Sequence, residues 1–311
     1  MFLITGFLAL MMAGLSLDVT SGTDADDLPV DDGTGDGDDS PSGDIIPGTP
    51  LGEFLDGTAR DDQMNGGSGD DTLRGHAGRD DMFGGEGDDL IEGGADGDWL
   101  HGIGGNDTIL GGAGNDSLAG HFGDDSLEAG AGHDLAYGGD GHDTVLGGDG
   151  MDSLFGNEGA DLILGGHGRD EVMGGEGADT LSGSDTQSAS APGDDGLDYV
   201  NGGKDDDVIV VGAGDHAEGN EGADRFLLNP GLTEVSTLDG SITRLADYDP
   251  AQDQIVIGYV PGPDGQTPQV AVQPDDDGAH LHIVIDGVAV AQVKADSGLT
   301  ADAIQLQRLT V

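Results

Sequence analysis

Residues 66–74 read GGSGDDTLR and residues 111–119 read GGAGNDSLA, which are two copies of one nine-residue unit. The unit recurs 14 times without an insertion from Gly57 to Ser182. Its sixth position is Asp and its eighth position is apolar in every copy, and its first position is Gly in every copy except at Ala129. So regular a period predicts a repeat fold, in which each unit is stabilised by stacking on its neighbours.

The unit divides into a turn and a strand. Gly at positions one, two and four allows backbone conformations with positive φ, which tight turns need. Positions seven to nine place one apolar residue between two polar ones, as in a short strand with a single inward side chain. Two units per coil would form two parallel sheets back to back, with the position-eight residues stacked between them. The sequence therefore predicts an all-β stack of parallel strands over residues 57–227.

The array becomes irregular toward its end. A polar insert, Gly183–Pro192, interrupts it, and two further regular units follow. The next unit, Val211–Glu218, is one residue short, which places His216 where Asp is expected. Asp224 restores the pattern in the last unit, Gly219–Leu227.

Beyond Leu227, Gly becomes sparse and β-branched residues alternate with polar ones, a pattern typical of strands. Asp286-Gly287 is a strong signal for a two-residue hairpin turn. We expect a small antiparallel β domain over residues 228–311, with a helical turn near Leu299–Asp302. Its expected strands are Ile255–Ile257, Val270–Val272, Leu281–Ile285, Val288–Val293 and Ile304–Leu309.

Two segments precede the array. Met1–Leu17 is apolar, is short for a membrane-spanning helix and lacks the basic residues of a secretory signal. Its apolar character is interpreted as that of a targeting or anchoring segment. The alternative is an apolar terminus that packs on the domain. Asp18–Asp56 holds 12 acidic residues and no Lys or Arg, which indicates a solvated, disordered linker.

Composition excludes several classes of function. The 9 Lys and Arg against 63 Asp and Glu give a net charge of −54, which disfavours nucleic acids and anionic membrane surfaces. Any membrane contact would involve Met1–Leu17. The absence of Cys rules out disulfides, zinc–thiolate sites and a cysteine nucleophile. The sequence also lacks H-E-x-x-H and G-x-S-x-G motifs, so no catalytic residues are assigned.

The position-six aspartates predict bound cations. Those on the same side of the stack recur every 18 residues, and strand spacing would place them about 4.8 Å apart. Two bare carboxylates at that distance repel by about 3.5 kcal/mol at an effective dielectric constant of 20. Carboxylate and carbonyl oxygens in a flexible turn favour Ca²⁺ over Mg²⁺. We expect roughly a dozen Ca²⁺ ions, held by Asp62, Asp71, Asp80, Asp89, Asp98, Asp107, Asp116, Asp125, Asp134, Asp143, Asp152, Asp161, Asp170, Asp179, Asp198, Asp207 and Asp224.

The pattern G-G-x-G-x-D-x-U-x, with U apolar, resembles the haemolysin-type calcium-binding repeats of the RTX family. The resemblance implies a right-handed parallel β-roll with calcium in the turns. It also implies secretion through a type I ABC exporter that reads an uncleaved C-terminal signal, and therefore an extracellular or cell-surface location. Residues 242–257 look like the segment that often follows such arrays. There, Asp247, Asp249 and Asp253 either bind one more ion or are ordinary turn acids.

These observations predict a non-enzymatic, calcium-binding, exported protein whose β-roll folds outside the cell. A second interpretation is a surface or matrix adhesin that uses the β-roll as a rigid, calcium-dependent stalk. A third is the non-catalytic module of a secreted enzyme or toxin.

Overall fold

The computed structural model describes residues 43–184, 196–228, 242–259 and 266–309. Met1–Leu17 and most of the polar insert lie outside these residues. From Pro41 onward the chain forms one compact unit. The described residues contain no helix with the length and apolar character that spanning a lipid bilayer requires.

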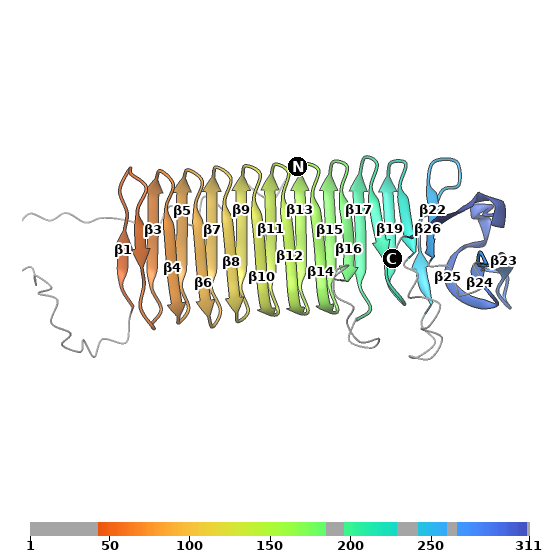
Figure 1. Ribbon diagram of the computed structural model, residues 1–311, viewed down its shortest axis with the longest axis horizontal. Coiled ribbons are helices and arrows are strands. Elements are labelled where there is room, and N and C mark those ends of the chain that lie inside the picture. Colours follow the sequence, from red (N-terminus) through yellow and green to blue (C-terminus); the bar gives the residue numbers. More distant parts are fainter. Residues whose placement is uncertain (1–42, 185–195, 229–241, 260–265, 310–311) are drawn as a thin grey trace, which may run out of the picture. The chain divides into compact units, whose positions relative to one another are not determined.

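Two β-sheets run the length of this unit, and the chain alternates between them (Figure 1). Sheet A contains, in spatial order, β1 (Ile45–Pro47), β3 (Gln63–Ser68), β5 (Asp81–Glu86), β7 (Trp99–Gly104), β9 (Ser117–Phe122), β11 (Leu135–Asp140), β13 (Ser153–Glu158), β15 (Glu171–Glu176), β17 (Tyr199–Lys204), β19 (His216–Glu221), β21 (Thr243–Leu245), β25 (Val288–Lys294), β24 (His280–Ile285) and β23 (Val270–Pro274).

Sheet B contains β2 (Phe54–Asp56), β4 (Thr72–Ala77), β6 (Leu90–Ala95), β8 (Thr108–Ala113), β10 (Ser126–Gly132), β12 (Thr144–Gly150), β14 (Leu162–Gly168), β16 (Thr180–Ser184), β18 (Val208–Val211), β20 (Arg225–Leu228), β22 (Gln254–Tyr259) and β26 (Ile304–Arg308). Two short 3₁₀ helices, η3 (Ala295–Ser297) and η4 (Ala301–Ala303), lie between β25 and β26.

The expected parallel pairing of units 18 residues apart is confirmed. Leu73 of β4 lies opposite Ile91 of β6, and the same step continues to Ile109 of β8. Most strands have six residues where three were expected, because positions one to three of the following unit remain paired with the next coil. The glycines of the turn therefore form part of the sheets.

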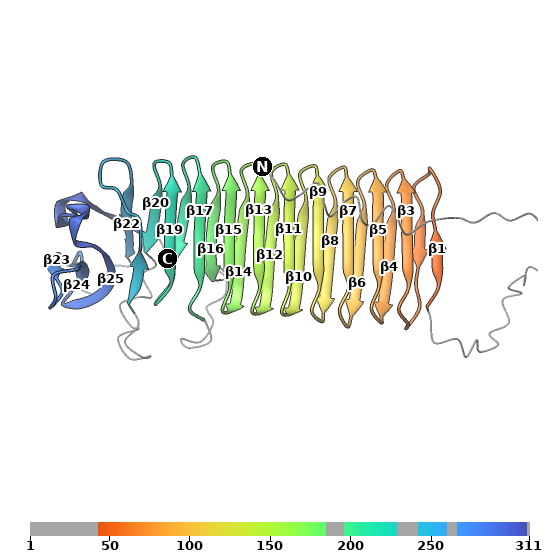
Figure 2. The same cartoon turned by 180° about the vertical axis from the view of Figure 1, so that it is seen from behind.

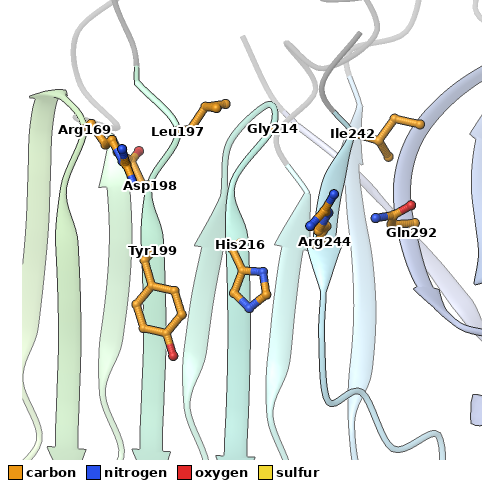
Figure 3. A pocket seen from close by; sticks show the side chains of 9 residues that line it. All are labelled: Arg169, Leu197, Asp198, Tyr199, Gly214, His216, Ile242, Arg244 and Gln292. Carbon is orange, nitrogen blue, oxygen red and sulfur yellow. The ribbon is translucent and has the colours of Figure 1, made fainter.

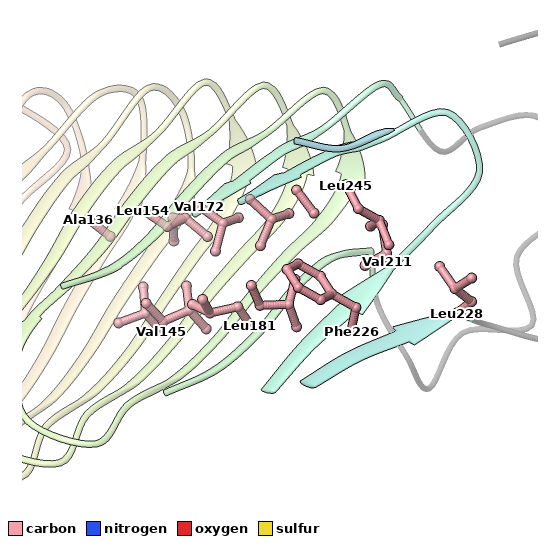
Figure 4. Packing of buried hydrophobic residues seen from close by; sticks show 14 of the residues in the cluster. Ala136, Val145, Leu154, Val172, Leu181, Val211, Phe226, Leu228 and Leu245 are labelled. Carbon is pink, nitrogen blue, oxygen red and sulfur yellow. The ribbon is translucent and has the colours of Figure 1, made fainter. Parts of the chain in front are cut away.

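The core is the stack of position-eight residues. Every one of them in the regular units is 0–1% exposed. Figure 4 shows the two facing rows, with Ala136, Leu154 and Val172 from sheet A opposite Val145 and Leu181 from sheet B. A coil contributes only one such residue from each sheet, so burial depends on neighbouring coils.

The glycines of the turn are needed for two different reasons. Positions two and four have positive φ, as at Gly67 and Gly69, and most non-glycine residues there adopt it too, including Ile103 at 90°. Position one instead lacks room for a side chain: a Cβ on Gly93 would lie 2.5 Å from Oδ2 of Asp98. The expected backbone freedom therefore explains positions two and four but not position one.

Both ends of the stack extend beyond the expected array (Figure 2). At the N-terminal end, β1 and β2 pair in parallel with β3 and β4, inside the range expected to be linker. At the C-terminal end, β21, β22 and β26 continue the parallel pairing. The predicted antiparallel strands are confirmed as β23, β24 and β25. The Asp286-Gly287 turn joins β24 to β25 with φ values of 49° and 89°.

Candidate metal centres

The position-six aspartates lie immediately before or at the start of the strands, and all 17 predicted ligands are 0–3% exposed. They form two stacked rows. Row A runs beside sheet A through Asp62, Asp80, Asp98, Asp116, Asp134, Asp152, Asp170 and Asp198. Row B runs beside sheet B through Asp71, Asp89, Asp107, Asp125, Asp143, Asp161, Asp179, Asp207 and Asp224.

One oxygen of each carboxylate joins adjacent coils. The backbone N–H of Asp107 donates to Oδ1 of Asp125 at 2.7 Å, and the same bond repeats along both rows. The rows continue across the insert, where the N–H of Asp170 donates to Oδ1 of Asp198, 28 residues later, at 2.8 Å. These bonds fix the direction in which each aspartate side chain points.

The other carboxylate oxygen, Oδ2, is buried and has no hydrogen-bond partner in fourteen aspartates of the described region. They are Asp71, Asp80, Asp89, Asp98, Asp107, Asp116, Asp125, Asp134, Asp143, Asp152, Asp161, Asp179, Asp207 and Asp224. A buried polar atom without a partner is costly, and a row of them is a strong indication of a missing ligand.

A second oxygen lies beside many of these atoms. The space that a Cβ of Gly93 would fill is 2.5 Å from Oδ2 of Asp98 and 2.9 Å from the carbonyl oxygen of Gly111 in the next coil. The same pairing of a carboxylate oxygen with a carbonyl oxygen recurs at Gly75 and Gly156. The position-one glycines therefore keep open a cradle bounded by oxygen atoms.

Burial makes the ionised carboxylates unfavourable. Desolvation, with the neighbouring aspartates adding to it, raises the pKa of Asp98 and Asp107 to about 7 and that of Asp207 to about 8. The same causes raise the pKa of Asp80 and Asp89 to about 6. At neutral pH these rows need either protons or a cation to offset their charge.

The donor set identifies the kind of cation that fits. The polar atoms that bound the cradles are carboxylate and carbonyl oxygens, and they come from turns rather than from a rigid cage. Ca²⁺ accepts six to eight such oxygens in flexible geometry, whereas Mg²⁺ requires a tight octahedron. The residues therefore fit Ca²⁺, with Oδ2 of position six and the position-one carbonyl as donors.

The structure corrects one assignment of the sequence analysis. His216 does not occupy an aspartate position: it lies on β19 opposite Tyr199, and Asp215 continues row A. The N–H of Asp198 donates to Oδ1 of Asp215, and the N–H of Gly212 donates to its Oδ2 at 2.6 Å. The missing residue of this unit lies within the turn, before the aspartate, where counting nine-residue periods cannot place it.

Row A begins and row B ends in a carboxylate whose Oδ2 accepts a hydrogen bond from the protein. Oδ2 of Asp62 accepts the Thr58 N–H at 2.6 Å, and Oδ2 of Asp253 accepts the Asp249 N–H at 2.7 Å. Asp253 extends row B, because its Oδ1 accepts the N–H of Asp224. Asp247 instead accepts the N–H groups of Gly219 and Asn220, so the three acids Asp247, Asp249 and Asp253 hold separate backbone segments.

A further set of contacts was missed by the sequence analysis. Position-five side chains accept the N–H of position five in the next coil: Asp88 from Asn106 at 2.8 Å, Asn106 from Asp124 at 3.0 Å, and Asp124 from His142 at 2.8 Å. His142 accepts from Ala160 through Nδ1 at 2.9 Å. These bonds run opposite to those of the aspartate rows. The only signal in the sequence was the recurrence of Asp, Asn and His at position five.

A family model agrees with calcium binding by these repeats. The family model described as RTX calcium-binding nonapeptide repeat (4 copies) matches residues 56–91, 83–118, 92–127, 119–154, 146–181 and 193–215. A comparison with curated proteins gives no match. Among solved structures, the chain is similar to the solution structure of the AlgE6R3 subunit of the Azotobacter vinelandii mannuronan C5-epimerase. The identity is 28%, the TM-score is 0.24, and the match covers 56% of this chain and 77% of that chain.

Proposed function

The chain belongs to the family of RTX calcium-binding nonapeptide repeat proteins, and from this premise we propose that it is an exported protein whose coils fold when Ca²⁺ enters the aspartate rows. The observation that carries the proposal is the row of buried Oδ2 atoms without partners. At Asp98 and several other positions the Oδ2 atom lies beside a carbonyl oxygen, in a cradle that a position-one glycine leaves open.

Calcium binding would supply the free energy that the bare stack lacks. In its absence, carboxylates such as those of Asp98 and Asp116 lie in adjacent coils with their charges desolvated. An ion that binds only the folded stack stabilises it by about 1.4 kcal/mol per site when its concentration is ten times the dissociation constant. Over roughly a dozen sites this contribution is large relative to the net stability of an ordinary domain.

The proposal places folding outside the cell. Calcium modules that act outside cells bind at about 10⁻⁴–10⁻³ M, so such sites would be empty in a calcium-poor cytosol and filled in the medium. An unfolded chain can pass through a narrow channel, and folding after exit would favour passage in one direction. We propose a type I ABC exporter as the partner in this step and a secreted or cell-surface location for the product.

The proposed role is not catalytic. The strands from β3 to β20 are occupied by the repeat, and its inward side chains form the stacked core. The two continuous sheets also support the second interpretation, a calcium-dependent stalk on a surface or in a matrix, because parallel pairing runs unbroken from β1 to β21. Cell fractionation separates the two: a protein recovered only from the medium is not an anchored stalk.

Circular dichroism with and without calcium tests the central proposal. In excess EDTA at pH 8 we expect little β-sheet signal, and on addition of millimolar CaCl₂ we expect a cooperative gain. MgCl₂ at the same concentration is the matched control and should produce a much smaller gain. A complete β-sheet signal in EDTA at that pH would overturn the proposal.

A further inference from the structure

A cavity of about 490 Å³ lies over strands β17, β19 and β21 of sheet A, beside the turn that enters β15 (Figure 3). Arg169 lies on one side of it and Arg244 on the other, with Tyr199 and His216 between them. The volume lies within the range of about 300–1,000 Å³ that is usual for small-molecule sites.

Two arginines in one cavity are unusual for this chain, which has 9 Lys and Arg against 63 Asp and Glu. Among the described Lys and Arg residues, Arg74 Nε lies 2.7 Å from Glu92 and Lys204 pairs with Glu176. Arg169 and Arg244 form no ion pair with a described residue. What distinguishes these two from the other cations is that they line the same cavity.

The floor of the cavity is a row of side chains at one register. Tyr199, His216, Arg244 and Gln292 lie on neighbouring strands as successive pairing partners. The rings of Tyr199 and His216 stack with centroids 5.4 Å apart and planes 13° apart. This row places two stacked aromatic rings between the two guanidinium groups.

Two acidic groups near the cavity have other hydrogen-bond partners. Glu218 accepts the Tyr199 hydroxyl at 2.8 Å and lies 3.1 Å from Nε2 of His216. Asp198, which also lines the cavity, directs Oδ1 at the N–H of Asp170 within row A. A third acid, Glu171 of β15, is the pairing partner of Tyr199 and lies at the same register as the floor.

We propose that this cavity binds a small ligand with an oxyanion group at each end and an uncharged middle, of the α,ω-dicarboxylate class. The fork of Arg169 takes one end and that of Arg244 the other, because guanidinium groups bind carboxylates through paired hydrogen bonds. The middle lies over Tyr199 and His216, and the amide of Gln292 can donate a further hydrogen bond. Three strand spacings of about 4.8 Å separate β15 from β21. A ligand that reaches both arginines must therefore be extended rather than compact.

Isothermal titration calorimetry tests this site on the full chain, in a buffer in which circular dichroism shows it folded. The outcome therefore does not depend on what folds the coils. The probes are suberate, with two separated carboxylates, succinate, with two close ones, and butyrate and methyl phosphate, each with one oxyanion. We expect suberate to bind at least tenfold more tightly than the other three.

The variants Arg169→Gln and Arg244→Gln should each weaken suberate binding by roughly tenfold to a hundredfold, the loss expected for a charged hydrogen-bonding partner. Arg169→Lys should be intermediate, because it keeps the charge without the fork. Arg79→Gln is the matched control: Arg79 occupies the same repeat position in an earlier turn, and its loss should leave binding unchanged.

Three results would overturn the proposal. The first is no binding of suberate to the folded wild-type chain at millimolar concentration. The second is equal affinity for suberate and butyrate. The third is the same loss of affinity in Arg79→Gln as in Arg169→Gln.

Discussion

The backbone N–H of Asp89 donates a 2.8 Å hydrogen bond to Oδ1 of Asp107 in the next coil, while Oδ2 of Asp107 is buried with no partner. One carboxylate therefore does two things. Oδ1 holds the adjacent coil in position through this hydrogen bond, and Oδ2 faces only the space between the coils. Substitutions that separate these two roles distinguish a structural hydrogen bond from an ion site.

Asp107→Asn keeps an oxygen that can accept the Asp89 N–H but removes the charge. We expect the calcium concentration at half-folding to rise and one ion fewer to bind. In EDTA the same variant should be slightly more folded than the wild type, because burial has raised the pKa of Asp107 to about 7 and the ionised form is unfavourable. Calcium titration followed by circular dichroism measures both effects.

The control for this variant is Asp140→Asn, which removes the same charge from an exposed position on β11. It should leave the calcium midpoint within experimental error. Equal shifts in the two variants would mean that total charge, not the buried row, governs the response.

Without calcium, the folded chain should become more stable as the pH falls from 8 to 5, because its buried carboxylates have raised pKa values. The folded-state pKa is raised to about 6 in Asp80, about 7 in Asp98 and about 8 in Asp207, against an ordinary value of 3.8. Groups shifted in this direction stabilise the folded state at low pH and lose that contribution as the pH rises through 6 to 8. In EDTA, β-sheet signal should therefore grow as the pH falls from 8 to 5.

With millimolar calcium the signal should be flat over the same interval, since the ion replaces the proton. The calcium midpoint should rise as the pH falls, because protons compete for the same oxygens. A calcium-free chain equally unfolded at pH 5 and pH 8 would contradict this prediction.

Gly93→Ala should weaken calcium binding at one site although no ligand residue is replaced. The added methyl group would lie 2.5 Å from Oδ2 of Asp98 and 2.9 Å from the carbonyl oxygen of Gly111. We expect a higher calcium midpoint and a lower melting temperature. Gly104→Ala is the matched control, because the nearest atom to its methyl group would be Oε2 of Glu86 at 3.5 Å, an ordinary contact. Equal effects in both variants would contradict the proposal that the space beside Gly93 holds a calcium ion.

Ile103→Gly should stabilise the folded chain. Ile103 adopts φ of 90° at a position where most units have Gly, and a β-branched residue in that region is strained by about 1–2 kcal/mol. Thermal melting in calcium should show an increase of a few degrees. Leu110→Gly, at a half-buried strand position without positive φ, should instead lower the melting temperature. A destabilised Ile103→Gly would show that side-chain packing outweighs the backbone strain.

The sequence predicted the parts of the fold that depend on period. The position-eight residues form the core, and the position-six aspartates form the buried rows. Strands 18 residues apart pair with each other, as the period predicted. It failed where the period is not kept. Asp215 was missed because a deletion inside a turn moves the aspartate relative to the count, although hydrogen bonding keeps it in row A.

The first coil was missed for a different reason. Ile45–Pro47 and Phe54–Asp56 lack the glycine pattern, and the acidic residues around them resemble a linker. Their pairing is supplied by the edges of β3 and β4, which no local pattern reveals. The position-five bonds escaped prediction because Asp, Asn and His accept equally well there, so no single residue type marks the position.

The interval between Asp170 and Asp198 is ten residues longer than the regular step, yet the hydrogen bond between them is as short as those elsewhere in row A. The alignment of coils is thus carried by the bonds across the interface and not by the length of chain between them. The stretch of chain between β16 and β17 can therefore accept foreign sequence. A peptide epitope or a small folded domain inserted there should leave the coils before and after it undisturbed.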